Sequence, residues 1–215
     1  MGDMADQRPL GLRERKKLNT RKALSDAAVA LMYERGPDTV VREDIAERAG
    51  VSLRTFSNYF ATKYDAVAYR HGHRIRLSAD LLRARPADEP LWTALAEALA
   101  EPLRTDAAPY GQPPSAQPST VRAWNATAEM RTALARVDTS ALVAALTERI
   151  GATPGDLYPQ LIANVAISAM NTVLDRFLDD SLEKPVPATL REVFDAIAQG
   201  LPAGRDSAAG DPAAR

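Results

Sequence analysis

Hydrogen-bond donors are concentrated in one short stretch of this chain, residues 52–59. Phe56 and Phe60 lie four residues apart, so a helix over this stretch would place both rings on one apolar face. Six other side chains of the stretch can each donate a hydrogen bond to a phosphate oxygen or to a base edge. These candidate contact residues are Ser52, Arg54, Thr55, Ser57, Asn58 and Tyr59. The stretch therefore indicates a short helix with one packed face and one face able to contact nucleic acid.

The residues before this stretch predict the element that would hold it in place. Ile45, Ala46 and Ala49 form an apolar stripe of a preceding helix, which Gly50 ends because glycine readily takes a positive φ. Ser52 is a suitable N-cap for the next helix. Two short helices joined by such a turn are typical of a helix-turn-helix, whose second helix enters the major groove.

Residues 11–65 resemble the DNA-binding domain of the TetR family of bacterial transcriptional regulators. The resemblance rests on motifs in matching order: GLRERKK, the helix end YERG at 33–36, IAERAGVS, Thr55-Phe56, Asn58-Tyr59-Phe60 and Thr62-Lys63. Two positions depart from the family pattern. Val41 replaces the usual threonine cap of the second helix, and Arg42 replaces an apolar residue. Asp44 can partly compensate, because an acid in the first turn suits the helix dipole.

Basic residues flank the predicted helix-turn-helix on both sides. Lys63 lies at the start of a fourth helix, near free N–H groups, where a phosphate is readily bound. A second group precedes the first predicted helix, 18–35: Arg13, Arg15, Lys16 and Lys17. This run is either an arm that follows the DNA backbone or the minor groove, or a solvated helix start.

Composition supports a cytoplasmic protein that binds DNA. Residues 1–85 hold 17 Lys+Arg and 11 Asp+Glu (+6), and residues 86–215 hold 10 and 17 (−7), which sum to the net charge of −1. The positive half carries the helix-turn-helix, as a surface that meets phosphates requires, although such a split also arises by chance. There is no cysteine, signal peptide, membrane-spanning run or catalytic motif. We expect no enzyme activity, metal site or cofactor.

The helical periodicity predicts an all-α chain with an N-terminal three-helix helix-turn-helix domain and a larger helical regulatory and dimerisation domain. Further helices are expected at about 90–104, 121–151 with a break, 156–180 and 188–200. The expected domain order is: 1–11 disordered arm, 12–65 DNA-binding domain, 66–85 connecting helix, 86–201 ligand-binding and dimerisation domain, and 202–215 disordered tail. In the TetR family the last two helices usually form the dimer interface.

The helix expected at 156–180 is apolar nearly all the way round, which predicts a largely buried helix. A polar stripe runs along it: Asn164, Ser168, Asn171 and Asp175. Buried polar groups need partners, so this stripe lines an internal ligand pocket, lies in a subunit interface or forms one solvated face. Four more residues are either ligand contacts or core filling: Trp92, Trp124, Asn125 and Met130.

These features predict a homodimeric repressor that leaves a palindromic DNA operator when a small, mostly apolar molecule binds. Two alternatives remain. The chain can be a transcriptional activator or a regulator that needs no ligand. The second, less favoured alternative is that the helix-turn-helix is a protein-binding helical module.

Overall fold

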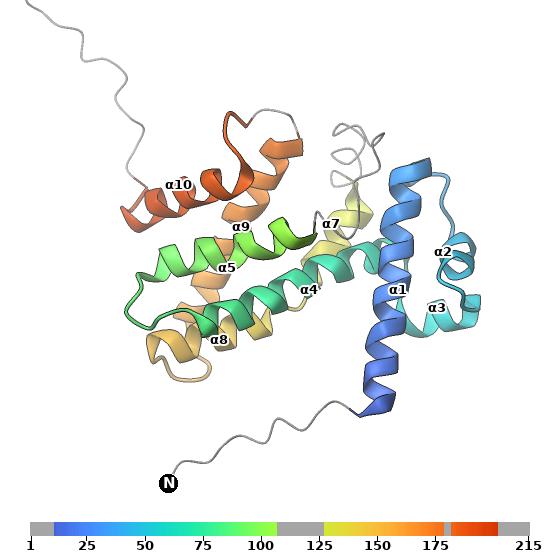
Figure 1. Cartoon of the computed structure of the whole chain (residues 1–215), viewed down its shortest axis with the longest axis horizontal. Helices are drawn as coiled ribbons and strands as arrows, with labels where there is room; N and C mark the ends of the chain where they lie inside the picture. The colour runs from blue at the N-terminus through green and yellow to red at the C-terminus, as the bar shows by residue number, and fades with distance from the viewer. Residues whose placement is uncertain (1–10, 107–126, 179–181, 202–215) are drawn as a thin grey trace, which may run out of the picture. The chain divides into compact units, whose positions relative to one another are not determined.

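The computed structural model describes residues 11–106, 127–178 and 182–201, and these residues are helical with no strand. The all-α prediction is confirmed. The described helices are α1 (Leu12–Arg35), α2 (Arg42–Arg48), α3 (Leu53–Tyr59), α4 (Lys63–Ala84), α5 (Leu91–Asp106), α7 (Ala128–Ala135), α8 (Ser140–Ile150), α9 (Leu157–Leu178) and α10 (Val186–Ala198). Figure 1 shows them along the chain. The expected arm and tail lie outside the described residues, apart from Gly11.

The chain divides into two compact units. The first unit takes its described helices from residues 1–75 and 105–139, and the second from residues 76–104 and 140–215. The division falls within α4, after Ile75, whereas the sequence suggested a boundary near Pro86. Helix α4 therefore contributes to both units, its first half to one and its second half to the other.

In the first unit, α2 packs against both α1 and α3 (Figure 1). Buried side chains of these helices, of the residues next to them and of the start of α4 form one core: Leu24, Ala27, Ala28, Leu31, Met32, Val40, Ile45, Ala46, Phe56, Phe60 and Ala66. Arg48 of α2 also makes two hydrogen bonds of 2.7 Å to the carboxylate of Glu34 in α1, and this contact lowers the pKa of that carboxyl group. Since α2 and α3 have only seven residues each, they depend on this core for their stability.

In the second unit, α9 packs against α8 and α10. Its core includes the fully buried side chains of Leu82, Leu95, Leu99, Leu142, Leu146 and Phe194. The ring of Trp92 lies 5.9 Å from that of Phe194, centroid to centroid. This contact places Trp92 beside the core of the unit.

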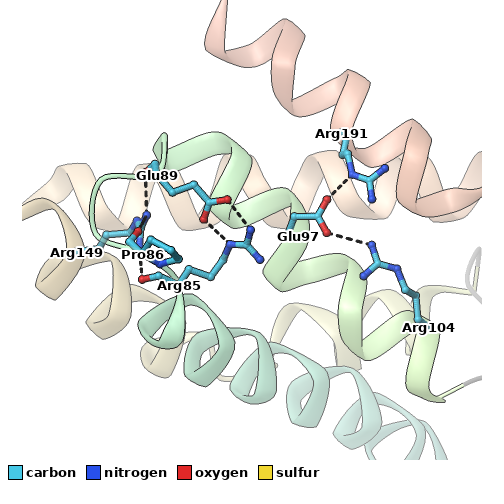
Figure 2. Close-up of polar contacts among 7 residues, drawn as sticks. All are labelled: Arg85, Pro86, Glu89, Glu97, Arg104, Arg149 and Arg191. Atoms are coloured by element: carbon cyan, nitrogen blue, oxygen red, sulfur yellow. Dashed lines mark hydrogen bonds and ion pairs between the residues drawn. The ribbon is translucent and has the colours of Figure 1, made fainter.

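Polar contacts tie the end of α4 to α8 and α5 to α10 within the second unit (Figure 2). The Arg149 guanidinium donates to the carbonyl oxygens of Pro86 at 2.7 Å and Glu89 at 2.8 Å. Glu97 accepts hydrogen bonds from Arg104, at 3.2 Å, and from Arg191. These contacts connect segments far apart in the sequence, so the helices are held by charged groups as well as by the apolar core.

Two sequence-based predictions about helices need correction. Helix α1 begins at Leu12, six residues earlier than expected, so the basic run lies within its first two turns. Helix α9 is not largely buried in a single chain. Its side chains Leu157, Leu161 and Phe177 are 79%, 51% and 45% exposed. A helix with apolar residues on all sides can be buried within its own chain or can present one face to a partner, and the sequence pattern does not distinguish the two.

Candidate DNA-binding surface

The turn between α2 and α3 has the geometry expected of a helix-turn-helix. Gly50 has a φ of +68°, which most residues with a side chain avoid, and Val51 N–H donates to the carbonyl of Ala46 at 2.9 Å. The hydroxyl of Ser52 accepts from the N–H of Thr55 at 3.1 Å and so caps α3. This turn determines the direction in which α3 leaves α2.

Helix α3 has one buried and one exposed face. Phe56 is fully buried, and its ring packs 6.0 Å from that of Phe60, centroid to centroid. Arg54, Ser57 and Asn58 are exposed, and none of them pairs with another side chain in the described part of the molecule. The exposed face therefore offers a guanidinium, a hydroxyl and an amide to an outside partner.

Three other residues expected at this surface are less free. The Thr55 hydroxyl lies 2.9 Å from that of Ser52, so these two groups serve the cap of α3. Tyr59 is half-buried and packs against the core of the first unit. These positions support the shape of α3, and Thr55 and Tyr59 are half-buried while Ser52 is exposed.

The start of α2 lacks the usual capping side chain, because Val41 occupies that position and is 50% exposed. The carboxylate of Asp44 accepts the Val41 N–H at 3.1 Å. Asp44 therefore compensates by a direct hydrogen bond, in addition to its favourable charge near the helix N-terminus. No side-chain hydroxyl is present at the cap to contact a phosphate.

The basic residues near the helix-turn-helix fall into two groups. Arg13, Arg15, Lys16 and Lys17 lie on α1 and are all exposed. The ammonium of Lys63, in contrast, donates to the carbonyl oxygens of Pro37 and Val40, the latter at 2.8 Å. Sequence reasoning missed this contact because it joins residues that are 23 and 26 positions apart.

Arg21 is a further cation that sequence reasoning did not single out. Its guanidinium carbon lies 5.7 Å from the ring centroid of Phe60 and 5.3 Å from that of Tyr69. Cations over aromatic faces are stabilised by the ring quadrupole. Arg21 thus joins α1 to α4 through the aromatic residues that follow α3.

The expected ligand residues are scattered. Asn164, Ser168 and Asn171 are exposed on α9, which fits an interface or a solvated face and does not fit an internal pocket. Met130 is buried in the first unit, whereas Trp92 is half-buried in the second. Trp124 and Asn125 lie outside the described residues.

A helix-turn-helix whose second helix has an exposed polar face is the arrangement that many DNA-binding proteins place in the major groove. Family models agree: that of the bacterial regulatory proteins of the tetR family matches residues 24–68, and that of the MftR C-terminal domain matches residues 89–202. The second match covers more than half of the chain. The chain belongs to the TetR family, and it is a DNA-binding transcriptional regulator.

Solved structures of TetR-family regulators share the fold. Thermus thermophilus FadR, a transcriptional repressor solved with lauroyl-CoA, is 18% identical, covers 89% of this chain and all of its own, and has a TM-score of 0.53. A TetR transcriptional regulator from Rhodococcus sp. RHA1 is 16% identical, covers 90% of this chain and all of its own, and has a TM-score of 0.53. No curated protein matches the chain. These neighbours are regulators and not enzymes. No helix in the described residues could cross a membrane.

Proposed function

We propose that the protein is a cytoplasmic homodimeric repressor that binds a near-palindromic operator through α3. The observation that carries the proposal is the exposed face of α3, where Arg54, Ser57 and Asn58 have no partner among the described side chains. Arg54 reads a base, because guanidinium groups bind guanine O6 and N7 with two hydrogen bonds. Ser57 and Asn58 add polar contacts, while Tyr59 contacts the backbone.

The first two turns of α1 supply the electrostatic part of the interface. Their four exposed cations are within a single helix and can each neutralise one phosphate. Phosphate contacts fix the position of the protein on the duplex, and base contacts select the sequence. We therefore assign Arg13, Arg15, Lys16 and Lys17 to affinity and α3 to specificity.

Dimerisation through α9 and α10 follows from the apolar side chains that α9 exposes in one chain. Leu157, Leu161 and Phe177 would each be covered by a second copy, and large exposed apolar groups on one helix are typical of such interfaces. A two-fold dimer also places two copies of α3 on two half-sites, which doubles the number of base contacts.

Release of the operator by a small, mostly apolar molecule is the regulatory part of the proposal. Its support is the apolar second unit and the lauroyl-CoA bound by FadR, a molecule with a long acyl chain. The ligand must bind more tightly to the form of the dimer whose recognition helices do not match the operator spacing. Acyl-CoA thioesters are therefore the first compounds to test.

A second candidate is a regulator that needs no ligand and whose second unit only dimerises. It is favoured by the exposure of Asn164, Ser168 and Asn171 on α9, because exposed side chains in one chain are available to a second subunit. The same DNA-binding unit would then act without an inducer, either as a repressor or as an activator.

Footprinting on the promoter beside the protein's own gene tests both candidates. The expected result is a two-fold-symmetric protected region that weakens with salt and disappears when the right acyl-CoA is added. Protection that no acyl-CoA or free fatty acid reduces would favour the ligand-independent regulator. Equal, weak binding to every duplex at low salt would refute the operator and leave a protein-binding module.

A further inference from the structure

The segment between α1 and α2 is attached to the first residue of α4. The Lys63 ammonium donates to the carbonyls of Pro37 and Val40, and in the described residues no other donor reaches these two oxygens. The side chain of Val40 is fully buried, so the same short segment is anchored in the core and held by Lys63. The backbone that leads into α2 is therefore fixed at two points.

The contact with the two carbonyls explains why a lysine occupies the first position of α4, where its charge does not stabilise the helix. A positive charge at a helix N-terminus opposes the helix dipole, and the start of α4 is stabilised instead by Asp65, whose carboxylate accepts the Thr62 N–H at 2.9 Å. The ammonium also lies 5.4 Å from the ring centroid of Tyr64. Lys63 thus has three protein partners and is half-buried, unlike the exposed cations of α1.

We propose that Lys63 is a positioning residue for the recognition helix, acting through the segment that leads into α2, and not a phosphate contact. Helices α2 and α3 have seven residues each and cannot hold their own orientation. A shift at the start of α2 is passed to α3 through the tight turn at Gly50. Sequence specificity then depends on Lys63, although its side chain touches no base.

The salt dependence of DNA binding separates this role from a phosphate contact. A lysine that neutralises a phosphate contributes about 0.9 to the slope of log K against log salt. A lysine whose ammonium is held by carbonyl oxygens contacts no phosphate directly, so its removal should change that slope by much less than about 0.9. Lys17, which is exposed on α1 and has no side-chain partner in the described residues, provides the matched control.

The test uses full-length Lys63→Met and Lys17→Met with the duplex that the native protein selects from a random library. Binding is measured by fluorescence anisotropy over a salt series, at a temperature where circular dichroism shows each variant fully folded. We expect Lys63→Met to keep the native slope and to lose about tenfold affinity for the selected duplex, with about twofold or less for an unrelated duplex. Lys17→Met should lower the slope and weaken both duplexes alike.

A third variant, Lys63→Arg, retains a charge and two donors for the same carbonyls, so it should recover most of the specificity. Two results would overturn the proposal. A slope reduced by about 0.9 per recognition head in Lys63→Met would make Lys63 a phosphate contact. If the ratio of the affinities for the selected and the unrelated duplex were unchanged in folded Lys63→Met, Lys63 would only stabilise the fold.

The inference rests on the proposed DNA-binding function, and a measurement without DNA keeps the two separable. In Lys63→Met the amides of residues 38–45 should exchange hydrogen faster than in the native protein, while those of α8 should not change. If the native protein selects no duplex, the proposed function fails, and the exchange result still tests whether Lys63 holds the segment between α1 and α2. Unchanged amide exchange over residues 38–45 would show that Lys63 does not hold this segment.

Discussion

At the scale of single residues, charged side chains near α3 have different tasks although they look alike in the sequence. Arg54 is exposed without a partner in the described part of the chain, whereas Lys63 and Arg21 are engaged by carbonyl oxygens and aromatic rings. A cation already held by the protein has less to offer a nucleic acid: Lys63 donates to carbonyl oxygens within the protein, and the Arg21 guanidinium is held over two rings. Base reading is therefore expected from Arg54.

The first prediction concerns Arg54→Ala. Loss of a two-hydrogen-bond contact to guanine should cost about 1–3 kcal/mol of discrimination at one position of each half-site. Anisotropy titrations on duplexes substituted one base pair at a time would measure it. Lys16→Ala is the control, because loss of a phosphate contact weakens all duplexes equally. Uniform weakening by Arg54→Ala would show that another residue reads that base.

The second prediction concerns His71 on α4. Burial, and then the charge of Arg74, lowers the pKa of His71 to about 4 from its usual 6.5. Between pH 6.5 and about pH 4 the imidazole of His71 is protonated in the unfolded chain and neutral in the folded chain. The stability that the folded chain has above pH 6.5 is therefore lost as the pH falls towards 4. From about pH 7 to about pH 5 we expect a loss of ~1–2 kcal/mol in the free energy of unfolding from this residue.

Urea unfolding at several pH values measures this loss. His71→Phe removes the titrating group and should flatten that part of the pH dependence. His73→Gln, on the same helix, should leave it in place. The same decline in His71→Phe as in the native protein would show that other groups cause it.

At the scale of elements, the end of α4 is held by the last turn of α8. Arg149 donates to the carbonyls of Pro86 and Glu89, in the loop that directly follows α4 (Figure 2). The neighbouring Glu148 accepts a hydrogen bond of 2.7 Å from Arg83 of α4. Carbonyls at a helix C-terminus lack partners within the helix, and a cation there is favourable. These contacts hold the end of α4 and the loop after it against α8 within the second unit.

The third prediction is that Arg149→Met destabilises the protein by about 1.5–3 kcal/mol, because the charged hydrogen bonds to the carbonyl oxygens of Pro86 and Glu89 are lost. Thermal or urea unfolding would measure it. Arg131→Met is the control, since Arg131 is exposed on α7 without a side-chain partner in the described residues, and its effect should stay within about 0.5 kcal/mol. Equal effects of the two substitutions would show that the Arg149 contacts contribute little.

At the scale of the whole molecule, the proposed reading of a two-fold operator requires two copies of α3 in a fixed relation. The exposed apolar side chains of α9 are the part of the described surface that best explains how two chains would associate. The association must be tight enough to exist at the low concentrations of a regulator, since a single head would bind weakly.

The fourth prediction is that Leu161→Glu yields a folded monomer. Leu161 is 51% exposed in one chain, so the fold tolerates the charge, whereas a buried interface does not. Sedimentation should show a monomer, and operator binding should weaken most at low protein concentration. Leu77→Glu, at an exposed leucine of α4 that is 38% accessible, should remain dimeric. A dimeric Leu161→Glu would move the interface away from this part of α9.

The fifth prediction uses Asn171→Leu to separate the roles of the polar stripe on α9. If the stripe lies in the interface, as its exposure favours, the substitution should alter the dimer dissociation constant and leave the response to a ligand at saturating dimer unchanged. Sedimentation and operator titration with and without acyl-CoA measure both properties. A lost ligand response with unchanged dimerisation would return Asn171 to the ligand site.

Much of the fold and of the candidate DNA-binding surface could be predicted from the sequence, because their causes are local. Phe56 and Phe60 share a face by their spacing, Ser52 caps α3, and Thr62 and Asp65, three residues apart, form a capping pair at the start of α4. Helical periodicity, turn residues and caps act over a few positions, so they can be read without tertiary information.

Only the tertiary structure decided which groups are already occupied and which surfaces lie open. The sequence did not indicate the distant carbonyl partners of Lys63, and α9 looked buried because apolar periodicity does not say which apolar neighbour is present. By the same reasoning, the cap of α2 depended on where the Asp44 carboxylate points. Hydrogen bonding and burial depend on distances between residues far apart in the chain, and no local pattern encodes those distances.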